Sequence, residues 1–157
     1  MSTSKSPTLE LFERLDRFPL GKQLFAKGVC VRAPYFSTIR PRVLDVRAGR
    51  VEAAMSNRRA VQNHLGTVHA IAMCNLCEFT GGLAIEVSRP AEVRWIPRGM
   101  DVQYLKKAKT DLTAISEIEG IDWSVEQDVP VVVHVYDTDG NEVVRADIRM
   151  KASPTRG

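Results

Sequence analysis

The longest apolar stretch of the chain runs from Val68 to Glu86, and its apolar residues fall on every side of the helix that they would form. A helix without a wide polar face is normally buried. Thr67 is a suitable N-cap, and Arg89-Pro90 provides the stop because proline cannot continue a helix. The pattern therefore predicts one buried central helix over about residues 68–86. Its length and its polar interruptions argue against a membrane span.

Shorter periodic segments precede this helix. Leu9 to Phe18 has its apolar residues on one face and predicts a short amphipathic helix. The next segment, residues 21–36, is ambiguous because glycine and proline interrupt its helical pattern. Residues 43–46 and 51–55 flank Ala48-Gly49 and predict a β-hairpin.

Strand-like segments follow the central helix, at residues 92–97, 100–108, 111–118, 128–137 and 142–150. Asp139-Gly140 is a strong two-residue hairpin signal between the last two. Consecutive strands with short connections predict an antiparallel sheet, and one buried helix against it predicts an α+β domain in which the sheet wraps the helix. Such a sheet leaves its outer face or an edge uncovered, so we expect the chain to dimerise.

Composition limits the function classes. The chain has 157 residues, which is the length of one domain, and 44% hydrophobic residues. The first residues, Met1 to Pro7, lack the apolar run of a signal peptide. Three cysteines, two of them in the predicted buried helix, make a disulfide framework improbable, so we expect a reduced, cytoplasmic protein. The net charge of +3 suits a phosphate-bearing small ligand better than nucleic acid.

A polar motif precedes the central helix, and one carboxylate lies within it. The motif is Asn63-His64-Leu65-Gly66-Thr67-Val68-His69-Ala70, and the carboxylate is Glu78. The N–H groups of a helix's first turn have no intrahelical partner and carry the positive end of the dipole, so those of Val68, His69 and Ala70 are candidates to stabilise an oxyanion. A buried Glu78 would be costly unless paired, so it is either a structural acid with a partner or a catalytic group.

This motif and the position of Glu78 resemble the hotdog-fold acyl-CoA thioesterases of the phenylacetate-pathway type, and within them a subfamily with an Asn-His-Leu-Gly-Thr-Val-His pattern. The stretch 104–114 is also similar to the strand-turn-strand of such proteins. The resemblance covers about residues 38–150. It implies a hotdog fold at residues 38–151, after an N-terminal helical segment at 1–37 and before a tail at 152–157.

The resemblance also implies catalytic roles. Glu78 would be the general base or nucleophile, and Asn63 would orient the attacking water or the thioester. The Ala70 N–H would polarise the thioester carbonyl, although the family has a glycine at this position. Ala70 and Glu78 of one helix are roughly 12 Å apart at about 1.5 Å per residue. In hotdog dimers the acid comes from the partner's helix, which implies a site shared across the dimer interface.

Other polar residues have both a functional and a structural interpretation. His69 is a candidate for the catalytic set, but hydrogen bonding at the helix start is its more ordinary role. Candidate substrate- or CoA-binding residues are Gly66, His64, Lys106, Lys107, Lys109 and Arg58. Arg89 and Arg94 are further cations that could contact the phosphates of coenzyme A. Solvated surface charge is the simpler explanation for each basic residue taken singly. Redox cysteine pairs favour the N-terminus of a helix, where the thiolate is stabilised. Cys74 and Cys77 lie further along the predicted helix, so we interpret them as small core residues.

The sequence therefore predicts a homodimeric or tetrameric acyl-CoA thioesterase that needs no metal or cofactor beyond the coenzyme A portion of its substrate, and no membrane or nucleic-acid partner. One rival is a non-catalytic acyl-CoA or lipid-binding module, which Ala70 favours. An enoyl-thioester hydratase would need an acid beside its histidine, and Asn63 and His64 lack one nearby. A third rival is an interaction protein with a vestigial pocket.

Overall fold

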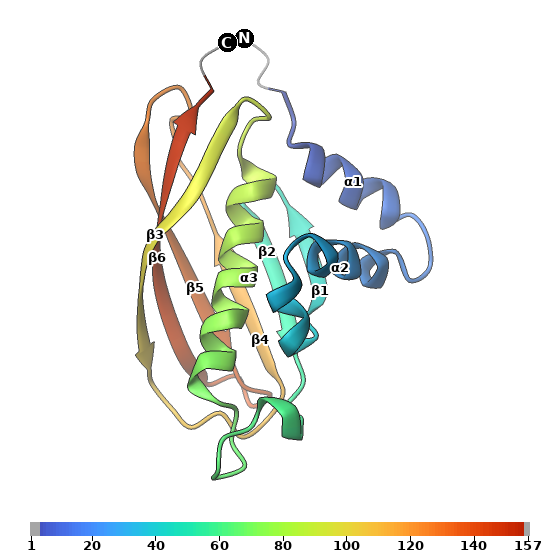
Figure 1. The fold of residues 1–157 in the computed structure, drawn as a ribbon, viewed down its shortest axis with the longest axis vertical. Helices are drawn as coiled ribbons and strands as arrows, with labels where there is room; N and C mark the ends of the chain where they lie inside the picture. The colour runs from blue at the N-terminus through green and yellow to red at the C-terminus, as the bar shows by residue number, and fades with distance from the viewer. Residues whose placement is uncertain (1–3, 156–157) are drawn as a thin grey trace.

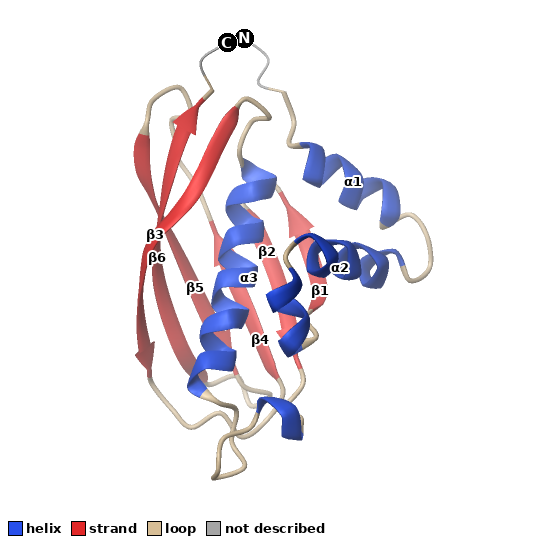
Figure 2. Cartoon of the chain, viewed as in Figure 1, coloured by secondary structure: helices blue, strands red, loops and turns tan. Residues whose placement is uncertain are grey.

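A computed structural model describes residues 4–155 and places one long helix, α3 (Ala70–Ser88), against a six-stranded sheet (Figures 1 and 2). The predicted α+β architecture with a central helix is confirmed. By length and composition α3 also qualifies as a membrane span, contrary to the expectation from the sequence, but 67% of the relevant window is buried inside the fold. Most of α3 is therefore covered by the rest of the chain, as a core helix is.

All strand pairs of the sheet are antiparallel, and their order is β1-β2-β4-β5-β6-β3. The strands are β1 (Arg42–Arg47), β2 (Arg50–Met55), β3 (Val93–Tyr104), β4 (Leu112–Glu117), β5 (Gln127–Tyr136) and β6 (Glu142–Pro154). Both predicted hairpins are present, β1–β2 around Gly49 and β5–β6 around Gly140. The two turn glycines have φ of 82° and 83°, a conformation that glycine adopts without steric cost.

The two strand-like segments 92–97 and 100–108 belong to one strand, β3. β3 is continuous, with a register irregularity between Pro97 and Gly99. A bulge of this kind absorbs a residue without reversing the chain. β3 pairs with β6 and not with its sequence neighbour β4, so residues 105–111 cross from the sheet edge to its middle.

Three N-terminal elements pack beside α3 and β1: α1 (Pro7–Leu15), α2 (Gly21–Arg32) and the 3₁₀ helix η1 (Pro34–Ile39) (Figure 1). The ambiguous segment 21–36 is thus helical to Arg32 and then turns. Edge-to-face aromatic pairs join these elements to each other and to the core, with Phe12–Phe25 centroids 5.1 Å apart and Phe36–Phe79 centroids 5.3 Å apart.

Gly81 and Gly82 allow α3 to lie close to the sheet. A Cβ on Gly81 would lie 3.0 Å from Ile148 Cδ1 and 3.1 Å from methyl groups of Val131 and Val133. Gly81 therefore lies close to strands β5 and β6, and Gly82 lies close to Trp95 of β3. This close approach fixes the depth of α3 over the sheet and so positions the start of the helix.

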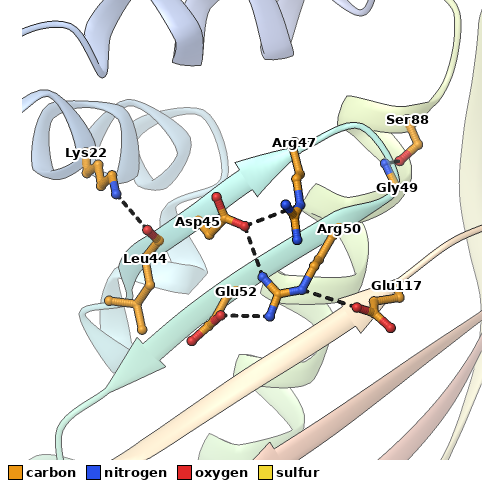
Figure 3. A network of polar contacts seen from close by, with 9 residues as sticks. All are labelled: Lys22, Leu44, Asp45, Arg47, Gly49, Arg50, Glu52, Ser88 and Glu117. Carbon is orange, nitrogen blue, oxygen red and sulfur yellow. Dashed lines mark hydrogen bonds and ion pairs between the residues drawn. The ribbon is translucent and has the colours of Figure 1, made fainter.

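A charged network on the sheet holds β1, β2 and β4 in register (Figure 3). Arg50 contacts Asp45, Glu52 and Glu117 at 3.0, 2.9 and 3.2 Å. At the turn between β1 and β2, the Gly49 N–H donates to Ser88 Oγ at 2.9 Å, which ties the hairpin to the end of α3.

The segment predicted as a tail, residues 152–157, begins as part of a strand. β6 continues to Pro154 and pairs there with the start of β3, at Val93. The remaining part of the predicted tail, residues 156–157, lies outside the described residues, as do residues 1–3.

Candidate active site

The polar motif before α3 forms a tight loop that is held by one side chain. Asn63 Oδ1 accepts from the N–H groups of Leu65 at 2.9 Å and Thr67 at 3.2 Å, and its Nδ2 donates to Thr67 Oγ1 at 2.8 Å. Gly66 has a φ of 75°, which explains the glycine at this turn. Asn63 thus builds the loop, and one of its two Nδ2 hydrogens remains for another acceptor.

Of the three backbone N–H groups predicted as oxyanion donors, two donate to carbonyl groups of the chain at the start of α3. The helix begins at Ala70, two residues later than predicted, because His69 and not Thr67 is the N-cap; its Nδ1 accepts from the Ile71 N–H at 3.1 Å. The Val68 N–H donates to Ala108 O and the His69 N–H donates to Val61 O, both at 2.8 Å. Within residues 4–155, the Ala70 N–H has no protein acceptor. It is therefore free to bind a developing negative charge.

The crossover of residues 105–111 passes beside this helix start and closes a hollow of about 370 Å³. The Ala108 carbonyl anchors the crossover through its bond to Val68. Predicted site residues that line the hollow are Asn63, Ala70, Lys106 and Lys107. The fold therefore joins the motif before α3 with the basic run after β3, which are about forty residues apart in the sequence.

Tyr104, at the end of β3, also lines the hollow and was not predicted as a site residue. Its Oη lies 3.2 Å from Cys74 Sγ on α3. This contact, together with burial, raises the pKa of Tyr104 to about 12, so the phenol keeps its proton at neutral pH. In the sequence Tyr104 appears only as one alternating strand residue. Its place in the site depends on the pairing of β3 with β6, which the sequence pattern does not reveal.

Glu78 is exposed in the single chain, and this corrects the expectation of a buried carboxylate. The amino-terminal half of α3 has a solvent-accessible strip that contains exposed Ile71 and Glu78 and half-buried Ala70 and Cys74. Glu78 has no hydrogen bond or ion pair within the described chain, so the structural interpretation, in which it pairs with an arginine, is not supported. The neighbouring thiol of Cys77 is buried, which raises its pKa to about 12 and agrees with its interpretation as a core residue.

Cys74 of this strip contacts Tyr104 of the edge strand β3. No strand pairs with the outer edge of β3 in the described chain. Large apolar side chains are exposed along it, with Ile96 at 60% and Tyr104 at 52%. An unpaired strand with exposed apolar residues is a surface on which a second sheet edge can add.

The remaining predicted residues lie apart from this hollow. His69 lines a separate hollow of about 240 Å³ on the other flank of α3, with Gln62 and Asn75. His64 and Gly66 are exposed in the loop, and Lys109 is exposed beyond the crossover. Arg58 donates to the Thr38 carbonyl, which links the turn before the motif to η1.

Arg89, considered above with the phosphate-binding cations, has a structural role instead. It pairs with Glu86 at 2.7 Å and donates to the carbonyl groups of Pro90, Ala91 and Val93. These bonds close the end of α3 onto the start of β3. They leave the guanidinium little capacity to bind a ligand.

Comparison with known proteins assigns the family. The model of a family described as a domain of unknown function, DUF4442, matches residues 21–152. A comparison with curated proteins gives no significant match.

Solved structures share the fold of the chain. The chain is 38% identical to a protein whose crystal structure is named genomics APC5556, with a TM-score of 0.83 over 94% of this chain and 99% of that one. A thioesterase family protein from Silicibacter pomeroyi is 20% identical, with a TM-score of 0.70 over 82% of this chain and 96% of that one. A thioesterase from Haemophilus influenzae is 13% identical, with a TM-score of 0.72 over 89% of this chain and 94% of that one. The chain therefore belongs to the DUF4442 family, and its fold is that of the hotdog-fold thioesterase superfamily.

Proposed function

We propose that the protein is a thioester hydrolase that cleaves acyl-CoA thioesters, with each active site shared between two chains of a homodimer. The observation that supports this most is the pairing of two uncommitted groups on one helix: a free Ala70 N–H at its start and an unpaired, exposed Glu78 further along. Several proteins of the same fold are named thioesterases.

The spacing of these two groups favours a dimer. Eight residues of helix separate Ala70 from Glu78 by about 12 Å at about 1.5 Å per residue, which is too far for both to act on one carbonyl. If the exposed edge of β3 pairs with the same edge of a second chain, the accessible strips of the two α3 helices come near each other. Glu78 of one chain can then serve the hollow beside Ala70 of its partner.

The proposed reaction uses water and needs no metal or cofactor. The Glu78 carboxylate takes a proton from water as the water oxygen bonds to the thioester carbonyl carbon. Negative charge develops on the carbonyl oxygen, and the Ala70 N–H with the dipole of α3 stabilises it. The carbonyl bond then re-forms as the C–S bond breaks, protonated Glu78 returns its proton to the leaving thiolate, and a carboxylic acid and a free thiol result. Lys106 and Lys107 at the mouth of the hollow are the proposed contacts of the coenzyme A phosphates.

Ala70 itself supports a second candidate, a module that binds acyl-CoA without hydrolysing it. Its methyl group stands where the resembling thioesterases have a glycine, next to the N–H that would contact the substrate. A side chain at this point restricts the approach of the carbonyl oxygen. Such a module would bind acyl-CoA saturably and release no thiol.

The test is thiol release from short, long and aromatic acyl-CoAs by the wild type and by Glu78→Gln. We expect turnover by the wild type and a loss of at least about 100-fold in kcat for the variant, since positioned general bases contribute about 10²–10⁴-fold. Glu119→Gln is the matched control because Glu119 is another exposed glutamate, after β4 and outside the lining of the hollow.

Each remaining outcome has a clear meaning. Turnover that survives in Glu78→Gln would refute the role of Glu78. Saturable binding of acyl-CoA by the wild type without thiol release would replace the hydrolase by the binding module. A similar loss in Glu119→Gln would attribute the effect to charge or stability rather than to catalysis.

A further inference from the structure

A second hollow, whose lining shares no residue with the candidate active site, lies between α2 and the opposite sheet edge. Its volume is about 820 Å³, within the range of about 300–1,000 Å³ typical of small-molecule pockets. Buried Ala26 and Val43 line it, and at its mouth Phe18 and Leu20 are exposed at 67% and 72%. A floor and a mouth that are both apolar suit a hydrocarbon chain.

Cations surround this apolar hollow. Lys27, Arg40 and Arg42 line it, and within residues 4–155 their side chains have no hydrogen-bond or ion-pair partner. A fourth cation, Lys22, lies 3.9 Å from Asp16, the one carboxylate in the lining. Burial raises the pKa of the Cys30 thiol, so that group adds no negative charge at neutral pH. The charge around the hollow therefore complements an anionic head group.

The geometry argues against two other occupants. A peptide strand would have to pair with β1, but a bulge between Val43 and Asp45 breaks its register, and Lys22 Nζ already donates to the Leu44 carbonyl at 2.7 Å (Figure 3). A second copy of the chain, joined across this hollow by a two-fold axis, would bring its own uncommitted cations against these. Like charges that meet without partners oppose association.

We propose that the hollow between α2 and β1 binds a free fatty carboxylate, with the hydrocarbon chain against Ala26 and Val43 and the head group between Lys27, Arg40 and Arg42. The site is separate from the hollow beside Ala70 and does not depend on hydrolysis. Glu78→Gln should therefore bind the carboxylate as the wild type does.

Dodecanoate is the probe, and titration calorimetry with amide chemical-shift mapping is the measurement. We expect saturable binding with shifts at Ala26, Val43 and Leu44. The double variant Lys27→Gln, Arg42→Gln should bind about fivefold to tenfold more weakly, because each exposed charge contributes modestly. The matched control is Arg14→Gln with Arg32→Gln, which removes the same charge from exposed helix positions outside the lining.

Several results would overturn the proposal. The first is the absence of binding by the wild type. The second is equal weakening in the two double variants, and the third is equal affinity for dodecanol, which has no charge. The last is shift changes confined to the Asn63–Ala70 segment, which would place the ligand in the candidate active site. Sedimentation with anionic phospholipid vesicles tests whether the cations of the hollow bind a membrane surface instead of a free carboxylate. Vesicle binding without dodecanoate binding also contradicts the proposal.

Discussion

At the scale of single residues, the Glu86 carboxylate connects three side chains from different parts of the fold. It accepts from Arg89, from Trp95 Nε1 at 2.7 Å and from Thr8 Oγ1 at 2.8 Å, and so joins α1, α3 and β3. Burial opposes its ionisation, but these hydrogen bonds outweigh burial, and the net effect is a lowered pKa. Glu86 therefore stabilises the fold through its charged form.

The sign of this pH dependence follows from the lowered pKa. The contribution is fully present above the ordinary value of 4.5 and is lost as the pH falls through the lower folded-state pKa. We expect Glu86→Gln to reduce the free energy of unfolding at pH 7 by about 1–3 kcal/mol, because it removes charge-assisted hydrogen bonds. The deficit should shrink below pH 4.5. Urea unfolding of the wild type and of Glu86→Gln across this pH range, at one protein concentration, measures the difference in the free energy of unfolding. A difference that is constant with pH contradicts the stabilising role of the charged carboxylate.

At the scale of elements, two helical glycines provide an internal comparison. Gly28 in α2 has nothing within 4 Å of an added Cβ, so Gly28→Ala should raise the free energy of unfolding by about 0.5–1 kcal/mol through helix propensity. In Gly81→Ala the same gain is opposed by three contacts of 3.0–3.1 Å with β5 and β6, and overpacking costs about 1–3 kcal/mol. We expect Gly81→Ala to be the less stable of the two by at least about 1 kcal/mol. Equal stability would show that α3 can lift off the sheet without cost.

The elements also show what sequence patterns can and cannot establish. The all-round apolar pattern locates α3 to within two residues, and the error arises because Thr67 bonds to Asn63 and leaves the cap to His69. The pattern also divides β3 into two segments, because a strand can contain Pro97 and Gly99 at a bulge without ending there. The exposure of Glu78 could not be predicted, because helix periodicity does not show which side of α3 the sheet leaves open.

Part of the candidate site depends on local sequence, and part depends on the packing of elements that are distant in the sequence. The loop from Asn63 to Ala70 is local, so its motif identifies it. Tyr104 joins the site through strand order, and the hollow between α2 and β1 arises from packing of distant elements. Neither the place of Tyr104 in the site nor the hollow between α2 and β1 produces a periodic pattern in the sequence.

At the scale of the whole molecule, the two edges of the sheet differ. The β1 edge has a bulge and a carbonyl capped by Lys22, whereas the outer edge of β3 has exposed Ile96 and Met100 and no pairing strand in the described chain. The β3 edge is therefore the proposed dimer interface. A site that takes Glu78 from one chain and Asn63 and Ala70 from the other has a distinctive consequence: two inactive variants can complement each other.

Co-expressed Glu78→Gln and Asn63→Ala chains should recover activity that neither variant has alone. In a mixed dimer, one site receives Asn63 from the Glu78→Gln chain and Glu78 from the Asn63→Ala chain, so that site is intact, while the other has both defects. Random pairing makes about half of the dimers mixed, so we expect about a quarter of wild-type turnover. Native mass spectrometry must confirm that mixed dimers form. If they form and turnover stays at the level of the single variants, the site lies within one chain, and Glu78 cannot act on a carbonyl held beside Ala70, because the helix itself keeps the two groups of one chain apart.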